Sequence, residues 1–261
     1  MSDFEQREAR LSGGTLRYYV GGEGRPVLYI HSAGGTRISA ALTGLAKDFR
    51  IYQPVLPGFD GTATLDSVSS MQDLANLAAE FAEREIGESC DVIGHSFGGW
   101  VAAWLAVLHG QRVGQLVLEA PAGFRPEGVG GLGGTPEELR RRMYAHPERI
   151  TTPEKAPQIQ AGNRRMVERY HGAMAMDQEL MARLHEITCP TLIVCGTKDG
   201  VIPPESGRLL RGRIRTSYLA FLYDAAHAIE VDQPLRFERL VREFLTRGEA
   251  FIINWGDAPA A

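Results

Sequence analysis

The sequence is poor in cysteine and has neither a long apolar run nor an excess of positive charge. Its three cysteines, Cys90, Cys189 and Cys195, form no paired pattern among the 261 residues, which favours a reducing cytoplasm over a disulfide-bonded secreted domain. No Cys/His spacing is typical of a zinc site. No apolar stretch approaches the roughly 20 residues that span a bilayer, and the charged N-terminus lacks the apolar core of a secretory signal. We therefore expect a cytoplasmic location, no membrane partner and no metal.

The charge balance argues against proteins that bind polyanions. Lys and Arg total 28 against 32 Asp and Glu, a formal net charge of −4 at pH 7, so nothing favours nucleic acid or an anionic lipid surface. Hydrophobic residues make up 44% and charged residues 23%, which is the balance of a globular protein with a sizeable core. We expect a small-molecule substrate and no cofactor.

Short apolar runs alternate with segments of helical spacing over the first 120 residues and again near the C-terminus. An antiparallel hairpin is expected within residues 8–20. The later strands are expected at 26–30, 50–56, 91–95, 114–119, 190–196 and 217–223, and the helices at 37–47, 70–87, 98–108 and 234–246. This alternation predicts an α/β fold with a mostly parallel central sheet that is flanked by helices.

The alternation stops at Pro121. Residues 121–187 contain no convincing strand, and Thr135-Pro136-Glu137-Glu138 is a capping box with proline at the first helical position. Further helices are expected around 158–170 and 178–186. We expect residues 1–120 and 188–261 to form the core and residues 121–187 to form a helical cap insertion. A face rich in Met and Tyr serves either packing or pocket lining; it comprises Met143, Tyr144, Met166, Tyr170, Met174 and Met181.

A Gly-x-Ser-x-Gly motif joins a predicted strand to a predicted helix. It reads Gly94-His95-Ser96-Phe97-Gly98. A serine on such a sharp turn is held in a strained backbone conformation, and small neighbours at both glycines are needed to avoid clashes. The motif and its context indicate that Ser96 is a nucleophile.

A nucleophilic serine needs a base, and the base needs an acid that fixes its tautomer. Asp199 and His227 each follow a predicted strand, and functional residues of a parallel sheet gather at the carboxyl ends of its strands. The chain order Ser96, Asp199, His227 is the order expected after a nucleophile elbow. Glu119, at the end of the strand that follows the elbow helix, is a rival for the acid.

These motifs resemble those of the α/β-hydrolase fold family, and the resemblance covers nearly all of the chain. The matching residues are His31-Ser32-Ala33-Gly34-Gly35, Gly94–Gly99, Gly196–Pro203 and His227. The resemblance implies that Ser96 is the nucleophile, His227 the general base and then acid, and Asp199 the orienting acid. It also implies an oxyanion hole made by the backbone N–H groups of Ala33 and Phe97. Ser32 stands where such loops usually have glycine.

The resemblance implies a serine hydrolase that cleaves an ester-type bond of a small, largely apolar substrate: a carboxylic ester, a lactone or a thioester. C–C bond hydrolysis or another non-ester reaction on the same triad is the alternative, and a non-catalytic sensor of a small ligand is a third. The candidate substrate-pocket residues are His31, Phe124, Met143, Tyr144 and Tyr170.

Several polar residues have two interpretations. His31, which is also a pocket candidate, either shapes the backbone of the loop that carries Ala33 or acts as a base. Asp60 is expected near the mouth of the site. Arg140-Arg141-Arg142 either forms a solvated face of the cap or attracts an anionic substrate. The tail 248–261 either packs on its own domain or meets a partner chain, and a homodimer is one option for the assembly.

Overall fold

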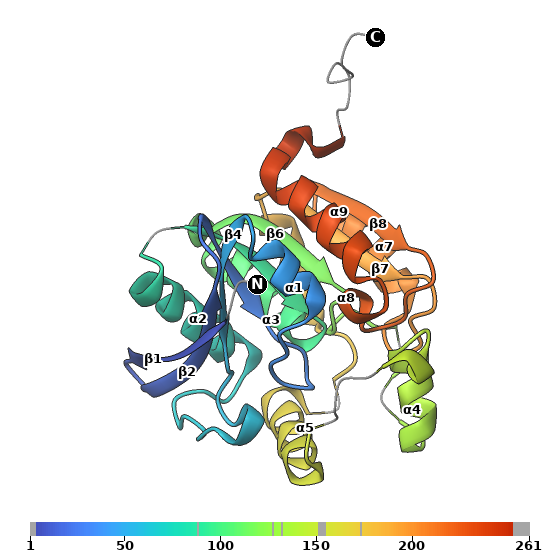
Figure 1. The fold of residues 1–261 in the computed structure, drawn as a ribbon, viewed down its shortest axis with the longest axis horizontal. Coiled ribbons are helices and arrows are strands. Elements are labelled where there is room, and N and C mark those ends of the chain that lie inside the picture. The colour runs from blue at the N-terminus through green and yellow to red at the C-terminus, as the bar shows by residue number, and fades with distance from the viewer. Residues whose placement is uncertain are drawn as a thin grey trace.

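A central sheet of eight strands organises the computed structural model, which describes residues 4–87, 89–126, 128–131, 133–150, 155–172 and 174–252 (Figure 1). The strand order is β1-β2-β4-β3-β5-β6-β7-β8. The strands are β1 Glu5–Leu11, β2 Gly14–Gly21, β3 Arg25–Ile30, β4 Phe49–Pro54, β5 Cys90–His95, β6 Val113–Glu119, β7 Thr191–Gly196 and β8 Ser217–Leu222. The first two strands form the expected antiparallel hairpin. From β4 onward, in the order β4-β3-β5-β6-β7-β8, each strand is parallel to its neighbours in this series.

Helices cover both faces of this sheet. The core helices are α1 Ala40–Leu45, α2 Met71–Glu85, α3 Phe97–Leu108, α7 Pro204–Arg213, α8 Ile229–Asp232 and α9 Pro234–Arg247. Buried side chains of α2, α3 and α7 pack in one cluster, and those of α1, α8 and α9 pack in another on the opposite face. The predicted α/β fold with a mostly parallel, helix-flanked sheet is confirmed.

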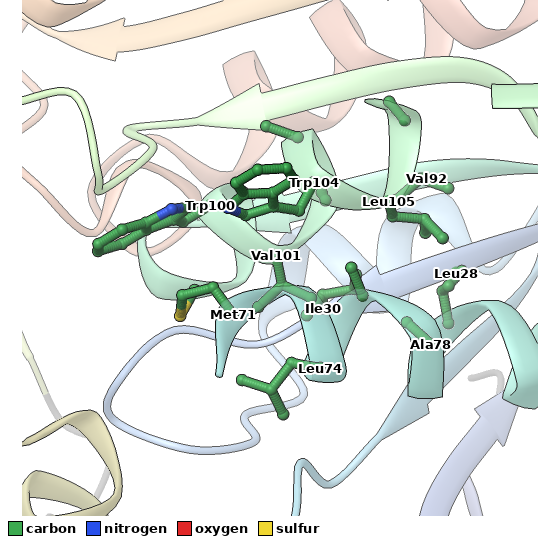
Figure 2. Close-up of a cluster of buried hydrophobic side chains, with 14 of the residues drawn as sticks. Leu28, Ile30, Met71, Leu74, Ala78, Val92, Trp100, Val101, Trp104 and Leu105 are labelled. Carbon is green, nitrogen blue, oxygen red and sulfur yellow. The ribbon is translucent and has the colours of Figure 1, made fainter. Parts of the chain in front are cut away.

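The helix α3 is apolar nearly all round because it lies between the sheet and α2. Figure 2 shows Trp104 and Val101 of α3 among Leu28 and Val92 of the central strands and Leu74 of α2. All residues of α3 from Phe97 to Ala106 are buried, so polar residues would gain nothing along this part of the helix. This burial fixes the axis of α3 and with it the position of Ser96 at its N-terminus.

The structure differs from the sequence-based expectation in α1 and α7, and the short helix α8 was not expected either. The helix expected at 37–47 begins only at Ala40, because Ser39 caps it and accepts a hydrogen bond from the Leu42 amide. The helix α7 was not expected, since Gly207, Gly212 and many charged residues obscure its apolar spacing. It packs on β7 and β8 through Leu210.

Residues 121–187 contribute α4 Pro136–Met143, α5 Pro157–His171 and α6 Gln178–Arg183. The described part of this segment forms no strand beyond a single bridge between Phe124 and Met176. In Figure 1, α5 lies at the bottom and α4 at the lower right, both below the sheet. The capping box predicted at Thr135 is present. That this segment acts as a cap stays a prediction.

At the C-terminus, the short 3-10 helix Gly248–Ile252 follows α9. Phe251 packs edge-on against Tyr218 and Phe244, so the start of the tail contacts its own chain; residues 253–261 lie outside the described residues. Among the described residues, no helix combines the length and the apolar character that a membrane crossing requires.

Candidate active site

Ser96 occupies the turn between β5 and α3. Its backbone has φ 55° and ψ −112°, a left-handed conformation that costs of the order of 1–3 kcal/mol for a residue with a side chain. A side chain at Gly98 would overlap the backbone carbonyl of Ile30, and one at Gly94 would overlap Gly98. The Ser96 amide donates to the Glu119 carbonyl at 2.8 Å. Tight packing and this hydrogen bond hold the strained serine in place.

The structure brings together Ser96, His227 and Asp199. His227 Nε2 lies 2.8 Å from Ser96 Oγ, and His227 Nδ1 lies 2.9 Å from Asp199 Oδ2. All three residues are buried. The other Asp199 oxygen accepts from the amides of Val201 and Ile202, each at 2.8 Å. These two amides orient the carboxylate so that it accepts from Nδ1–H, which leaves the Nε2 lone pair for the serine proton.

Glu119, the rival acid, does not contact His227. Its Oε1 accepts from the Glu230 amide at 2.9 Å, while its Oε2 is buried without a partner among the described residues. Burial, followed by repulsion from the Glu230 carboxylate, raises the pKa of Glu119 well above its ordinary value. Burial therefore favours the neutral form of Glu119, and its hydrogen bond to the Glu230 amide anchors the segment just after His227.

The Ala33 amide is directed by the carbonyl at the other end of its peptide bond. Ser32 O accepts from the Gly35 amide at 2.9 Å and from His31 Nδ1 at 2.7 Å. In a planar trans peptide the N–H points opposite to the C=O, so fixing the Ser32 carbonyl fixes the direction of the Ala33 N–H. Among the described residues this N–H has no acceptor.

The Phe97 amide is directed in the same way. The Ser96 carbonyl accepts from the amides of Trp100 at 3.1 Å and Ala122 at 2.9 Å. The Phe97 N–H therefore points away from both, at the first turn of α3, where helix N–H groups have no intrahelical partner. Both predicted oxyanion donors thus belong to peptide groups whose carbonyl ends are tied to the protein.

The two buried histidines next to these groups are neutral. His31 Nε2 accepts from the Leu56 amide at 3.0 Å, so its proton is on Nδ1, and burial lowers its pKa to about 4. His95 Nε2 lies 3.1 Å from the His227 carbonyl, and burial together with the nearby His227 lowers the pKa of His95 to about 3. Of the two interpretations of His31, shaping the loop backbone agrees with both hydrogen bonds.

The other predicted pocket residues make contacts within the protein. Tyr170 is buried, with its hydroxyl donating to the Pro57 carbonyl at 2.9 Å, and Phe124 is fully buried. Met143 and Tyr144 are half-buried; the Met143 carbonyl accepts from the Ala228 amide at 2.9 Å. Their role toward a substrate stays a prediction.

A cavity of about 250 Å³ lies between the loop before α1, residues 146–150 and α8. Among the described residues that line it are Arg37, Ser39, His146 and Glu230, and none of the five predicted pocket residues is among them. No three His, Cys, Asp or Glu side chains of the described residues gather as metal ligands.

Sequence reasoning missed a polar cluster beside the Ala33 loop. Asp60, which was expected near the mouth of the site, has a side chain that is only 10% exposed and pairs with Lys155 at 2.5 Å. Asn163 of α5 is 2% exposed and hydrogen-bonds to Asp60 and Gly34. A detectable signal was the position of Asn163 on the otherwise apolar face of α5 that holds Ile159, Met166 and Tyr170.

The fold and this site define an α/β hydrolase. The model of the alpha/beta hydrolase family matches residues 27–240, and the chain belongs to this family. It is 26% identical to a 2-hydroxymuconate semialdehyde hydrolase of Pseudomonas sp. (strain CF600), over 95% of this chain and 96% of that one. It is also 26% identical to a pimeloyl-[acyl-carrier protein] methyl ester esterase of Aeromonas hydrophila, over 86% of this chain and 96% of that one.

Among solved structures, a meta-cleavage product hydrolase from Pseudomonas fluorescens IP01 is similar to this chain with a TM-score of 0.78 and 25% identity. The match covers 92% of this chain and 97% of that one. These relatives are all hydrolases, and their names refer to a semialdehyde, a meta-cleavage product and a methyl ester.

Proposed function

We propose that this chain hydrolyses an ester-type bond of a small, largely apolar substrate through a Ser96 acyl-enzyme. The observation that carries the proposal is the hydrogen-bonded chain from Ser96 Oγ through His227 to Asp199, with two backbone N–H groups directed by their carbonyl partners. The likeness to an ester hydrolase over most of both chains supports it.

Each step of the reaction uses a group described above. Ser96 Oγ attacks the carbonyl carbon while its proton passes to His227 Nε2, and the oxyanion accepts from the Ala33 and Phe97 amides. His227 then gives the proton to the leaving oxygen or sulfur, and the C–O or C–S bond breaks to leave the acyl-enzyme. A water molecule, deprotonated by His227, attacks the acyl carbon and releases the acid. Each oxyanion donor accounts for about 10²–10³ in rate.

Hydrolysis of a C–C bond next to a ketone is the second candidate. It is favoured by the likeness to C–C hydrolases over nearly the full length of both chains. In that reaction the leaving group is a carbon that departs as an enolate, and His227 must protonate carbon instead of oxygen. The two reactions share Ser96, so they are separated by substrate and not by loss of the nucleophile.

Covalent labelling tests the nucleophile. A fluorophosphonate probe should label the wild type and fail to label the Ser96→Ala variant. Asp199→Asn should lower the labelling rate by about 10⁴, as in the analogous triad, whereas Glu119→Gln should leave it within about 10-fold. A folded wild type that resists the probe would refute the proposed function.

A substrate panel tests the reaction. Turnover of p-nitrophenyl and methyl esters of graded acyl length is compared with turnover of 1,5-diketone and dienone acids, each followed with wild type and Ser96→Ala. Ester turnover that Ser96→Ala abolishes supports the first candidate. Turnover of the diketones alone would transfer the assignment to C–C hydrolysis, and tight binding of panel members without turnover would indicate a sensor.

A further inference from the structure

One face of α5 rests on the loop that follows β4. This loop includes the 3-10 helix Phe59–Gly61. Met166 lies so close to Gly58 that a side chain at this glycine would overlap its sulfur, and the Tyr170 hydroxyl donates to the Pro57 carbonyl. Asn163, one turn before Met166, is the buried polar residue of this face.

Asn163 connects α5 to two segments of the core at once. Its Nδ2 donates to the Gly34 carbonyl at 3.0 Å and to Asp60 Oδ1 at 3.1 Å, while its Oδ1 accepts from the Asp60 amide at 2.8 Å. Both amide hydrogens and the amide oxygen are thereby used. An amide side chain that is 2% exposed and has every hydrogen satisfied is held in one orientation.

Asp60 extends this cluster to the segment after Gly34. Its Oδ2 accepts from the Thr36 amide at 2.8 Å and from Thr36 Oγ1 at 2.7 Å. Burial raises the pKa of Asp60, but hydrogen bonds from Lys155, Thr36 and Asn163 outweigh burial and hold it at about 2, so the carboxylate is charged. Gly35 has φ 83° and no space for a side chain beside Asp60 and Lys155, which keeps the loop against this charge.

Two peptide groups next to Ala33 are therefore held from opposite directions: Ser32–Ala33, which contains the Ala33 N–H, and Gly34–Gly35, whose N–H donates to the Ser32 carbonyl. The core holds the Ser32 carbonyl through His31 and Gly35, and α5 holds the Gly34 carbonyl through Asn163. We propose that Asn163 is a positioning residue that completes the oxyanion hole when α5 is docked on the core, an inference that rests on the proposed function.

The arrangement couples the seating of α5 to the chemical step. If α5 lifts, Gly34 loses its donor and Asp60 loses two of its partners, Lys155 and Asn163, on the same side. The peptide group of the Ala33 N–H is then held only by the hydrogen bonds of the core to the Ser32 carbonyl, and the direction of this N–H is less narrowly fixed. A substrate that holds α5 against the core therefore strengthens the oxyanion donor that its own transition state requires.

The test uses Asn163→Asp, which has nearly the same shape. The new side chain still accepts from the Asp60 amide, but its carboxylate cannot donate to Gly34 and faces the carboxylate of Asp60. The maximal rate of fluorophosphonate labelling should fall by about 10-fold to 10²-fold, which is at most the effect of losing one oxyanion donor. The half-saturating probe concentration should change little. Asn76→Asp is the matched control, because Asn76 is exposed on α2 and contacts His109 only through its oxygen.

The pH profile separates positioning from general destabilisation. Beside Asp60 in a buried place, the introduced carboxyl has a raised pKa, and once protonated it has an O–H that can donate to Gly34. The ratio of the Asn163→Asp rate to the wild-type rate should therefore rise as the pH is lowered from 8 to 5.5. Asn163→Ala should lose activity without this recovery, and it replaces the first variant if that one fails to fold.

Thermal unfolding checks that each variant is folded at the assay temperature. Labelling of Asn163→Asp at the wild-type rate, or an equal loss in Asn76→Asp, would overturn the inference while leaving the proposed function intact. A folded wild type that is not labelled, with Ser96→Ala indistinguishable from it, would instead refute the proposed function.

Discussion

Each ring nitrogen of His31 forms a hydrogen bond with a different backbone group, and both bonds can exist only when the imidazole is neutral. Nδ1–H donates to the Ser32 carbonyl, and Nε2 must stay unprotonated to accept from the Leu56 amide. A second proton would turn the Nε2 acceptor into a donor that faces another donor. The loop that presents Ala33 therefore depends on a neutral imidazole.

This dependence predicts how His31 contributes to stability at different pH values. The folded pKa is lowered to about 4 from about 6.5 in an unfolded chain, so below pH 6.5 the unfolded state binds a proton that the folded state does not. The contribution is complete above pH 6.5 and is lost as the pH falls toward 4, by about 3 kcal/mol in total.

The measurement is urea unfolding of wild type and His31→Gln at several pH values between 7.5 and 4. The difference in unfolding free energy between the two proteins isolates His31 from other titrating groups and should shrink as the pH falls. A difference that is the same at pH 7 and at pH 4.5 would contradict the neutral assignment.

At the residue scale, the groups that meet at the carboxyl ends of the strands could be predicted from the sequence. Ser96, Asp199 and His227 each follow a strand, and parallel pairing must bring such positions to one edge of the sheet. The contacts of Asn163 and Glu230 could not be predicted, because they depend on how α5 and α8 pack. The spacing of apolar residues along the sequence does not determine that packing.

At the scale of elements, α6 illustrates one residue with two duties. Asp177 caps α6, and its Oδ1 accepts from the Leu180 amide at 2.9 Å. Its Oδ2 accepts from the indole N–H groups of Trp100 and Trp104, each at 2.8 Å. Both indoles belong to α3 and are buried in the core, where Figure 2 labels them. Asp177 therefore links the segment 121–187 to α3, the helix that follows Ser96.

Replacing this carboxylate by an amide removes one of the two acceptors. In Asp177→Asn, either the helix cap or the two buried indole donors must face an NH₂ group, whichever way the amide is turned. We expect a loss of about 2–4 kcal/mol in unfolding free energy, measured by urea denaturation. Asn76→Asp, a polar exchange on the exposed face of α2, should change it by less than about 0.5 kcal/mol. Equal small effects would show that the indole hydrogen bonds contribute little.

Element boundaries were predictable where capping chemistry is local. The capping boxes at Ser70 and Thr135 are both present in the structure, because Ser or Thr followed three residues later by an acidic residue satisfies the first helix amides without tertiary contacts. The helix α7 could not be predicted in the same way, since Pro203 at its N-cap makes no side-chain hydrogen bond there and packing on β7 and β8 determines it.

On the scale of the whole molecule, burial is distributed unevenly. The strands β5 and β7 are buried along their whole length, whereas α4 has no buried residue. The alternating α/β pattern predicts the first property, because strands covered on both faces need continuous apolar runs. The seating of residues 121–187 could not be predicted, since helices with weak apolar faces can dock in several ways.

Hydrogen exchange should reflect this difference. Amides of α4 open locally at low cost, so they should exchange orders of magnitude faster than those of β5 and α3, which should approach the rate set by global unfolding. Mass spectrometry of peptides from both regions measures the ratio. Protection of α4 equal to that of α3 would contradict this expectation and would indicate a partner chain over α4, as in a homodimer.

The hydrogen bonds that hold the Ser32 and Gly34 carbonyls also bear on how new substrate specificities arise. The direction of the Ala33 N–H is set by the Ser32 carbonyl of the same peptide group, which His31 and the Gly35 amide hold, and Asn163 holds the carbonyl end of the Gly34–Gly35 peptide. The Ala33 side chain is half-buried and packs against the core, so a substitution at position 33 exchanges packing contacts while the peptide group that carries the proposed oxyanion donor keeps its hydrogen bonds. Libraries randomised at this position would explore substrate range with the chemistry held constant.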